Sequence, residues 1–218
     1  MNRARSPFGP ALAFALAFAF VRPAGASAQM EHDDALRLSG HLALGFAGEG
    51  DLSIDTILGT AVVHSDLDPT LGFGFRVEKP LFDFLSIGVM FETLSFLVDD
   101  SDREREWAFN FDALIRARYM FEAVRGELFL EPYLALPVGF TFGWLDDPDG
   151  DGDEAWPGWN IGALAGLAVI HSSRFGGFLE LGWRHLEVYT HVEALGGSDY
   201  AVTVNEFAMN LGVSYLLE

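Results

Sequence analysis

The stretch Asp146–Glu154, which reads DDPDGDGDE, places six carboxylates within nine residues. Four of them, at alternate positions, form a set that could converge on one ion: Asp147, Asp149, Asp151 and Asp153. Carboxylate oxygens in a short loop are ligands that Ca²⁺ prefers. The first chemistry that the sequence suggests is therefore calcium binding, and the alternative is a solvated acidic turn between two strands.

This stretch resembles the start of an EF-hand loop, in which alternate oxygen ligands precede an obligatory glycine. Here Asp147, Asp149 and Asp151 are followed by Gly152, but the position that should supply a bidentate glutamate is Gly158. We therefore expect at most a partial, weak calcium site, and no other cofactor.

The N-terminus has the three parts of a secretory signal peptide. Arg3 and Arg5 precede the apolar run Ala11–Val21, and small residues follow at Ala26–Ala28. An apolar run of about eleven residues is too short for a membrane-spanning helix, which needs about twenty. We predict a signal peptide over residues 1–28, with cleavage before Gln29.

Residues 29–218 have no linker-like stretch, so we predict a single domain. There is no cysteine, which excludes disulfides and thiolate metal sites. The formal charge of −19 becomes −22 when Arg3, Arg5 and Arg22 leave with the signal peptide. Such a field would repel nucleic acid and anionic lipid headgroups unless cations bridge them, so we expect no nucleic-acid partner.

Alternation of apolar and polar residues with a period of two is the main structural signal. In residues 107–121 the odd positions are almost all apolar, from Trp107 to Phe121, while Asn110, Asp112 and Arg116 lie on the even positions. Similar alternation occupies seven more segments, at about 35–47, 70–79, 85–92, 128–144, 158–171, 176–190 and 206–217. Strands of this length, apolar on one face, are typical of an eight-stranded antiparallel up-and-down transmembrane β-barrel, an all-β fold; the alternative is a soluble all-β domain such as a lipocalin-like barrel.

The connections between these segments alternate between long and short. Longer acidic loops are expected at about 48–69, 98–104, 146–154 and 196–199, and short turns near Lys79–Pro80, Arg125–Gly126 and Ser172–Arg174. Long loops on one side and short turns on the other orient such a barrel, with the loops outside the cell. Two aromatic belts are expected, with tryptophans at the loop end (Trp107, Trp144, Trp159) and other rings at the turn end (Tyr119, Phe121, Phe129, Phe175, Tyr215).

On these features the chain resembles the small eight-stranded outer-membrane proteins of Gram-negative bacteria, of the OmpA transmembrane domain, OmpX and OmpW type. Asn210, Gly212, Tyr215 and Leu217 resemble the C-terminal signal that the barrel assembly machinery recognises. There are two departures from it, because Leu217 stands where an aromatic residue is common and Glu218 follows Leu217. The resemblance implies an outer-membrane location. It also implies contact with outer-membrane lipid and lipopolysaccharide, and a monomer.

Charged residues of both signs fall on the face of the strands that should point inward. An eight-stranded barrel leaves an interior about wide enough for side chains, so we expect these charges to pair and to plug the lumen; a narrow ion path is the alternative. The predicted network contains Arg37, Arg76, Glu78, Glu92, Asp112, Arg116, Arg118, Glu131, Glu180, Arg184 and Glu206.

His171 and Ser173 resemble part of the motif of outer-membrane lipid A deacylases, in which a histidine activates a serine. No asparagine follows Ser173, an acid partner would have to be Glu180 or Glu187, and the predicted topology puts the pair at a periplasmic turn. We therefore expect a non-enzymatic barrel that serves envelope integrity or surface interaction. The alternatives are passage of small hydrophobic compounds, as in OmpW-type barrels, and a lipid A-modifying enzyme.

Overall fold

A computed structural model describes residues 35–56, 59–96, 106–146, 153–192 and 198–217. Within these ranges the regular elements are ten antiparallel strands. No helix in the described ranges is long and apolar enough to cross a membrane. The strands are β1 (Leu36–Thr56), β2 (Gly59–Leu67), β3 (Thr70–Phe82), β4 (Leu85–Phe96), β5 (Glu106–Arg118), β6 (Phe121–Val124), β7 (Leu128–Asp146), β8 (Asp153–His171), β9 (Phe175–Val192) and β10 (Ser198–Leu217).

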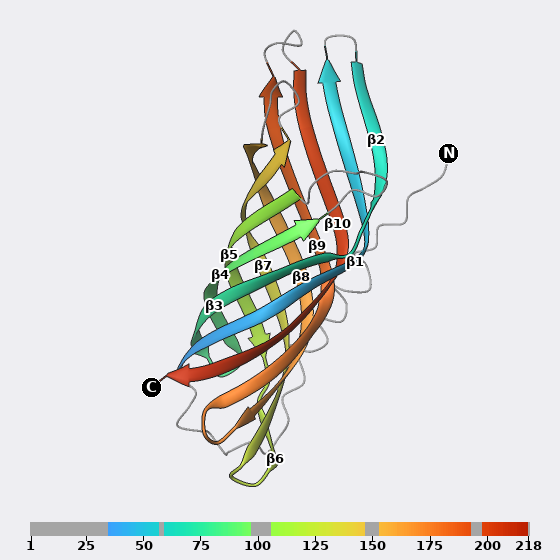
Figure 1. Cartoon of the computed structure of the whole chain (residues 1–218). Helices are drawn as coiled ribbons and strands as arrows, with labels where there is room; N and C mark the ends of the chain where they lie inside the picture. Colours follow the sequence, from blue (N-terminus) through green and yellow to red (C-terminus); the bar gives the residue numbers. More distant parts are fainter. Residues whose placement is uncertain (1–34, 57–58, 97–105, 147–152, 193–197, 218) are drawn as a thin grey trace, which may run out of the picture. The chain divides into compact units, whose positions relative to one another are not determined.

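Eight of these strands close into a ring (Figure 1). The order is β1-β3-β4-β5-β7-β8-β9-β10, and β10 pairs again with β1, from Leu36 opposite Leu217 to Asp55 opposite Asp199. Closure leaves no strand edge of the ring unpaired, which is the condition for a sheet to sit in lipid. We call the end with the turns at 83–84, 125–127 and 172–174 the turn end, and the opposite end the loop end.

The two strands outside the ring extend it. β2 pairs with Gly48–Thr56 of β1, beyond the part of β1 that pairs with β3, so β2 and β3 form one path interrupted at Asp68 and Pro69. The predicted long loop over 48–69 was therefore wrong: most of it is a hairpin that continues β1. Proline at position 69 removes a backbone donor, which accounts for the break. In the same way, β6 continues the line of β5 and pairs with β7.

Two other boundaries differ from the predicted ones. The strand that was expected to turn near Lys79–Pro80 continues to Phe82, and the turn lies at Asp83 and Phe84. The last strand already begins at Ser198, inside the predicted loop at 196–199.

The barrel is apolar outside and charged inside. Phe140 on the outer wall is 70% exposed, whereas the inward carboxylate of Glu131 in the same strand is 0% exposed. This is the reverse of a water-soluble sandwich and suits a lipid surround. The predicted loop-end tryptophans all point outward, and Trp107 pairs with Trp144 on neighbouring strands. Phe129 departs from the predicted turn-end belt because it points inward and is buried.

Candidate functional site

The inward face of the strands carries a stack of ion pairs, and its first layer lies at the turn end. Glu131 on β7 accepts two hydrogen bonds from Arg37 of β1, at 2.6 and 2.8 Å. Arg116 of β5 reaches the same carboxylate at 2.5 Å and Glu78 of β3 at 3.0 Å. Arg118 is 3.4 Å from Glu131. Four strands are therefore tied together through one layer of buried charge.

The second layer centres on Glu180 of β9. Arg76 of β3 binds it with both terminal nitrogens, at 2.6 and 2.7 Å. Tyr133 donates its hydroxyl proton to Glu180 at 2.8 Å, and the Asn210 amide donates at 3.0 Å. The ring of Tyr133 lies 3.5 Å from the guanidinium carbon of Arg116, which connects this layer to the first. Bidentate arginine pairs of this kind fix geometry as well as charge.

The third layer lies nearer the loop end. Arg184 of β9 binds Glu92 of β4 at 2.8 Å and Glu206 of β10 at 2.7 Å. His41 Nε2 lies 2.9 Å from the other oxygen of Glu92, and Thr70 donates to Glu206 at 2.7 Å. Because each carboxylate is shared between side chains from different strands, the three layers span the ring from wall to wall.

Beyond the third layer the interior becomes apolar. A buried cluster, which we call the apolar cap, fills the loop-end half with side chains from β1, β2, β4, β5 and β7 to β10: Ala43, Leu67, Leu94, Phe96, Ala108, Leu145, Trp156, Leu186, Val188, Tyr200 and Val204. The change occurs within single strands: on β9 Glu180 and Arg184 are followed by Leu186 and Val188. The interior is thus dominated by ion pairs toward the turn end and by the apolar cap toward the loop end, and the hydrogen-bonded side chains of Asn110, Thr141 and Asn160 lie at the boundary.

All the residues of the predicted lumen network are buried on the inward face. Ten of the eleven form ion pairs in the described part of the chain. Asp112 is the exception: it is buried but has no ion-pair partner among the described residues. Sequence reasoning left out His41, Thr70 and Tyr133, which complete the layers. All three share the parity of inward residues on their own strands, so the alternation would have found them.

The predicted calcium ligands Asp147, Asp149 and Asp151 lie outside the described residues. Asp153 begins β8 and its backbone pairs with that of Asp146. Within the described ranges, no group of three or more histidine or acidic side chains is arranged to hold a metal ion.

The residues of the predicted assembly signal all lie on β10. Asn210 is buried and binds Glu180, and Gly212 faces the ring of Phe178. Tyr215 packs against Phe175 with ring centroids 4.7 Å apart, and Leu217 pairs with Leu36.

His171 and Ser173 meet at an exposed turn. The Ser173 hydroxyl lies 2.8 Å from His171 Nδ1, and the Ser173 backbone N–H donates to the same nitrogen at 3.0 Å. No described carboxylate contacts this histidine, so the pair lacks the acid that would orient it for catalysis.

Comparison with solved structures gives the same fold. The chain is similar to the outer membrane protein OprG from Pseudomonas aeruginosa, with a TM-score of 0.53 and 13% identity over 85% of this chain and 96% of that one. Neisserial surface protein A also matches, with a TM-score of 0.47 and 13% identity over 83% and 96% of the two chains. No family model matches the sequence, and no curated protein matches it.

The predicted fold is therefore confirmed: the chain is an all-β, eight-stranded antiparallel barrel of the outer-membrane type. The identity is too low for the comparison to carry a function.

Proposed function

We propose that this protein is a non-enzymatic outer-membrane barrel whose lumen is closed to ions and solutes and whose acidic loop end serves envelope integrity or surface interaction. The observation that supports closure is the three-layer stack of buried arginine–carboxylate pairs. An ion that crossed would have to separate pairs such as Arg76–Glu180, whose side chains are almost fully buried. Separating a buried pair costs several kcal/mol, and the apolar cap, which has no charged side chain, adds a second barrier.

Planar-bilayer recording of the refolded mature protein tests closure. We expect no stable single-channel steps in the native barrel. Arg76→Ala together with Glu180→Ala removes both partners of the second layer without leaving an unpaired charge, and serves as the comparison for a weakened plug. Large, regular conductance steps from the native protein would contradict the proposal.

The charge of the loop end supports a surface role. In the described residues that lie beyond the apolar belt at this end, acids recur on β1, β2, β9 and β10, including Glu49, Asp51, Asp66, Glu187 and Asp199. The surface cations of the described ranges, Lys79, Arg125 and Arg174, all lie at the turn end. An acidic loop end would meet anionic lipopolysaccharide through divalent cations. We propose lipopolysaccharide and outer-membrane lipid as partners of a monomeric barrel.

Calcium binding by Asp147, Asp149, Asp151 and Asp153 remains a proposal attached to this role. Isothermal titration of the refolded protein with calcium tests it, with Asp149→Asn plus Asp151→Asn as the matched control. Heat at millimolar calcium that the double variant loses would support the site. Identical traces from both proteins would remove it.

Delivery to the membrane by the barrel assembly machinery is a further part of the proposal. It rests on the resemblance of Asn210, Gly212, Tyr215 and Leu217 to the C-terminal signal. Deleting Tyr215–Glu218 should leave the protein unassembled in cells, whereas Glu218→Phe should assemble at least as well as the native chain. The readout is heat-modifiable mobility of the membrane fraction.

A second function, passage of small hydrophobic compounds, is favoured by one feature of the wall. The pairing of β7 with β8 passes from Ala135–Leu164 to Val138–Ile161, with no paired residues between them. Pro137, which has no N–H, lies inside this gap and is buried against Gly162. Leu114 and Leu164 line the interior nearby. The missing backbone bond weakens the wall at this point, and the apolar residues on both sides suit the sideways exit of an apolar molecule from the interior.

Pro137→Val would restore a backbone donor to this ladder. If the barrel passes hydrophobic compounds, uptake of a fluorescent apolar probe by vesicles containing the native protein should exceed that of vesicles containing Pro137→Val. Equal uptake by both, at the level of empty vesicles, would leave closure as the function of the interior.

A further inference from the structure

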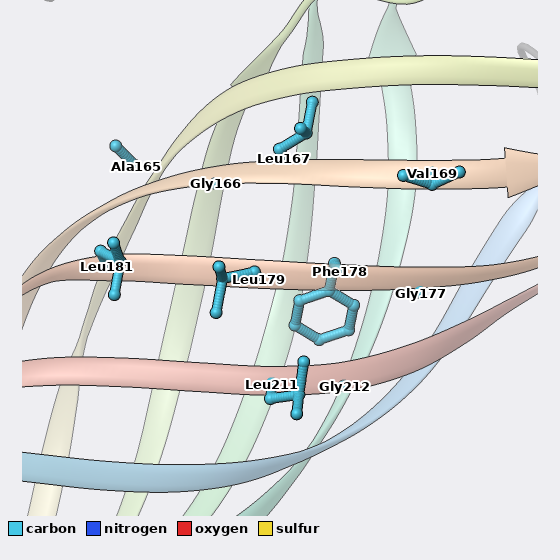
Figure 2. Close-up of a pocket in the computed structure, with 10 residues that line it drawn as sticks. All are labelled: Ala165, Gly166, Leu167, Val169, Gly177, Phe178, Leu179, Leu181, Leu211 and Gly212. Atoms are coloured by element: carbon cyan, nitrogen blue, oxygen red, sulfur yellow. The ribbon is translucent and has the colours of Figure 1, made fainter.

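A groove with a volume of about 540 Å³ lies along β8, β9 and β10 (Figure 2). Its lining includes the outward side chains of Leu167, Leu179, Leu181 and Leu211, whereas Ala165 and Gly177 leave space between them. The register places Leu167, Leu179 and Leu211 in one row across the three strands, with Gly177 in the next row toward the turn end. The groove is therefore part of the surface that faces lipid.

The turn that holds His171 and Ser173 lies at the turn-end mouth of this groove. His171 is the next outward position after Val169 on β8, and Phe175 and Tyr215 continue the same row on β9 and β10. His171 and Ser173 are exposed, so this polar pair lies at the rim of the apolar belt.

The hydrogen bonds of the turn fix the proton on His171. A backbone N–H can only donate, so the bond from Ser173 N makes Nδ1 an acceptor, and the proton of the neutral ring lies on Nε2. Nε2 has no partner among the described residues. Arg174, which closes the turn by donating its N–H to His171 O at 2.9 Å, adds a positive charge to it. The rim thus presents a ring N–H that suits a phosphate oxygen.

We propose that the groove and this turn together bind one glycerophospholipid of the turn-end leaflet, with an acyl chain in the groove and the phosphate at His171 Nε2. This inference goes beyond the proposed function and does not depend on it. It gives the His171–Ser173 pair a recognition role in place of a catalytic one.

The dimensions fit a single leaflet. From His171 to Ala165 the strand advances about 20 Å, which a tilt of about 40° converts to about 15 Å of depth, half of a hydrocarbon core of about 30 Å. An acyl chain whose head lies at the turn therefore ends at the far end of the groove.

The distribution of surface charge is less unfavourable to a phosphate at this end. The described surface of the turn end carries Lys79, Arg125 and Arg174 beside Asp83, Glu122 and Glu127, whereas the described surface of the loop end carries acids without cations. Because hydrocarbon surrounds the barrel on all sides, the groove gains only van der Waals contact from the chain. The phosphate contact must therefore supply much of the selectivity.

Native mass spectrometry of the refolded mature protein with dipalmitoyl phosphatidylglycerol tests the proposal. We expect one retained lipid, and Ala165→Leu should lower its retention several-fold, on the order of fivefold, by filling the groove. Ala113→Leu places the same change on the outward face of β5 and should have no effect. Gly177→Leu is the second variant, because an added Cβ there meets nothing closer than Gly212 O at 3.7 Å.

The head group is tested separately. His171→Ala should lower retention of phosphatidylglycerol and leave retention of dipalmitoylglycerol, which lacks the phosphate, unchanged. All variants are first shown to fold by heat-modifiable mobility. Equal retention by the native protein, Ala165→Leu and Gly177→Leu would overturn the groove assignment, and stronger retention of purified lipid A than of phosphatidylglycerol would overturn the leaflet and the head group.

Discussion

Glu131 is the residue on which most of the buried charge at the turn end converges. Three guanidinium groups, from Arg37, Arg116 and Arg118, lie within 3.4 Å of its oxygens, and the side chain is fully buried. A buried ion pair is weak evidence for stability by itself, because desolvation offsets the attraction. Removing one member of such a network should lower the stability of the barrel, because the remaining charges stay buried without a partner.

Glu131→Gln should therefore lower the free energy of unfolding by about 3–5 kcal/mol. Urea unfolding in lipid vesicles, followed by tryptophan fluorescence, measures this. Glu154→Gln, an exposed acid on β8, is the control and should change stability little. If the Glu131→Gln barrel is as stable as the control, water and not this carboxylate stabilises the charges of the three arginines.

Inward glycines make room for the rings between the layers. A Cβ added to Gly166 would lie 2.3 Å from Tyr133 Cζ, so any side chain there must displace a ring that binds Glu180 and stacks on Arg116. Gly177 on the neighbouring strand points outward and has no such neighbour.

Gly166→Ala should therefore destabilise the barrel by about 1–3 kcal/mol, through overpacking, in the same urea assay. Gly177→Ala, which makes an identical chemical change, should be close to neutral. If both variants unfold at the same urea concentration, the ring of Tyr133 has an alternative position, and the second layer is less rigid than its geometry indicates.

At the scale of the strands, the ladders of the ring differ in continuity. β9 and β10 pair without a break from Ser198 opposite Val192 to Tyr215 opposite Phe175, whereas β7 and β8 lose two pairs beside Pro137. Local opening of a sheet depends on such differences in backbone hydrogen bonding.

Amide hydrogen exchange in detergent micelles should therefore be faster at Gly162, the β8 residue whose N–H faces the interrupted ladder, than at the matched depth of β9 and β10, near Gly182 and Ala208. The expected difference is at least about tenfold in rate, equivalent to about 1.4 kcal/mol of opening free energy. Uniform protection around the ring would show that the gap at Pro137 is closed by its neighbours and would also weaken the case for lateral passage.

For the molecule as a whole, the two ends differ in their connections and charge, and we expect this asymmetry to place the loop end outside the cell. The chain has no cysteine, so single cysteines report orientation without background. Ala61→Cys on β2 marks the loop end, and Ala123→Cys on β6 marks the turn end; both positions are exposed.

A membrane-impermeant maleimide applied to intact cells should label Ala61→Cys and leave Ala123→Cys unlabelled until the outer membrane is permeabilised. The long hairpin and acidic connections at the loop end are the reason for this direction. Labelling of Ala123→Cys alone would invert the barrel and move the proposed phospholipid site to the outer leaflet.

Much of the barrel could be predicted from the sequence because a period of two in apolar residues has a direct structural meaning. This alternation correctly predicted that Asp112 and Arg116 lie inside the barrel and that Phe111 lies outside it on the same strand. The pattern could not say which charges pair, because Arg37 and Glu131 are 94 residues apart and meet only through the curvature of the ring. It also missed the hairpin of β1 and β2, where acids alternate weakly with apolar residues and resemble a loop.

Asn210 belongs both to the second layer of the finished barrel and to the proposed assembly signal. Its side chain is fully buried and donates to Glu180, so the amide that resembles part of the C-terminal signal is hidden once β10 has paired with β1 and β9. If the barrel assembly machinery recognises this amide, as we propose, it can do so only before β10 has paired with its neighbours. A closed barrel then no longer displays the signal, so it does not compete for that machinery with a chain that is still unfolded.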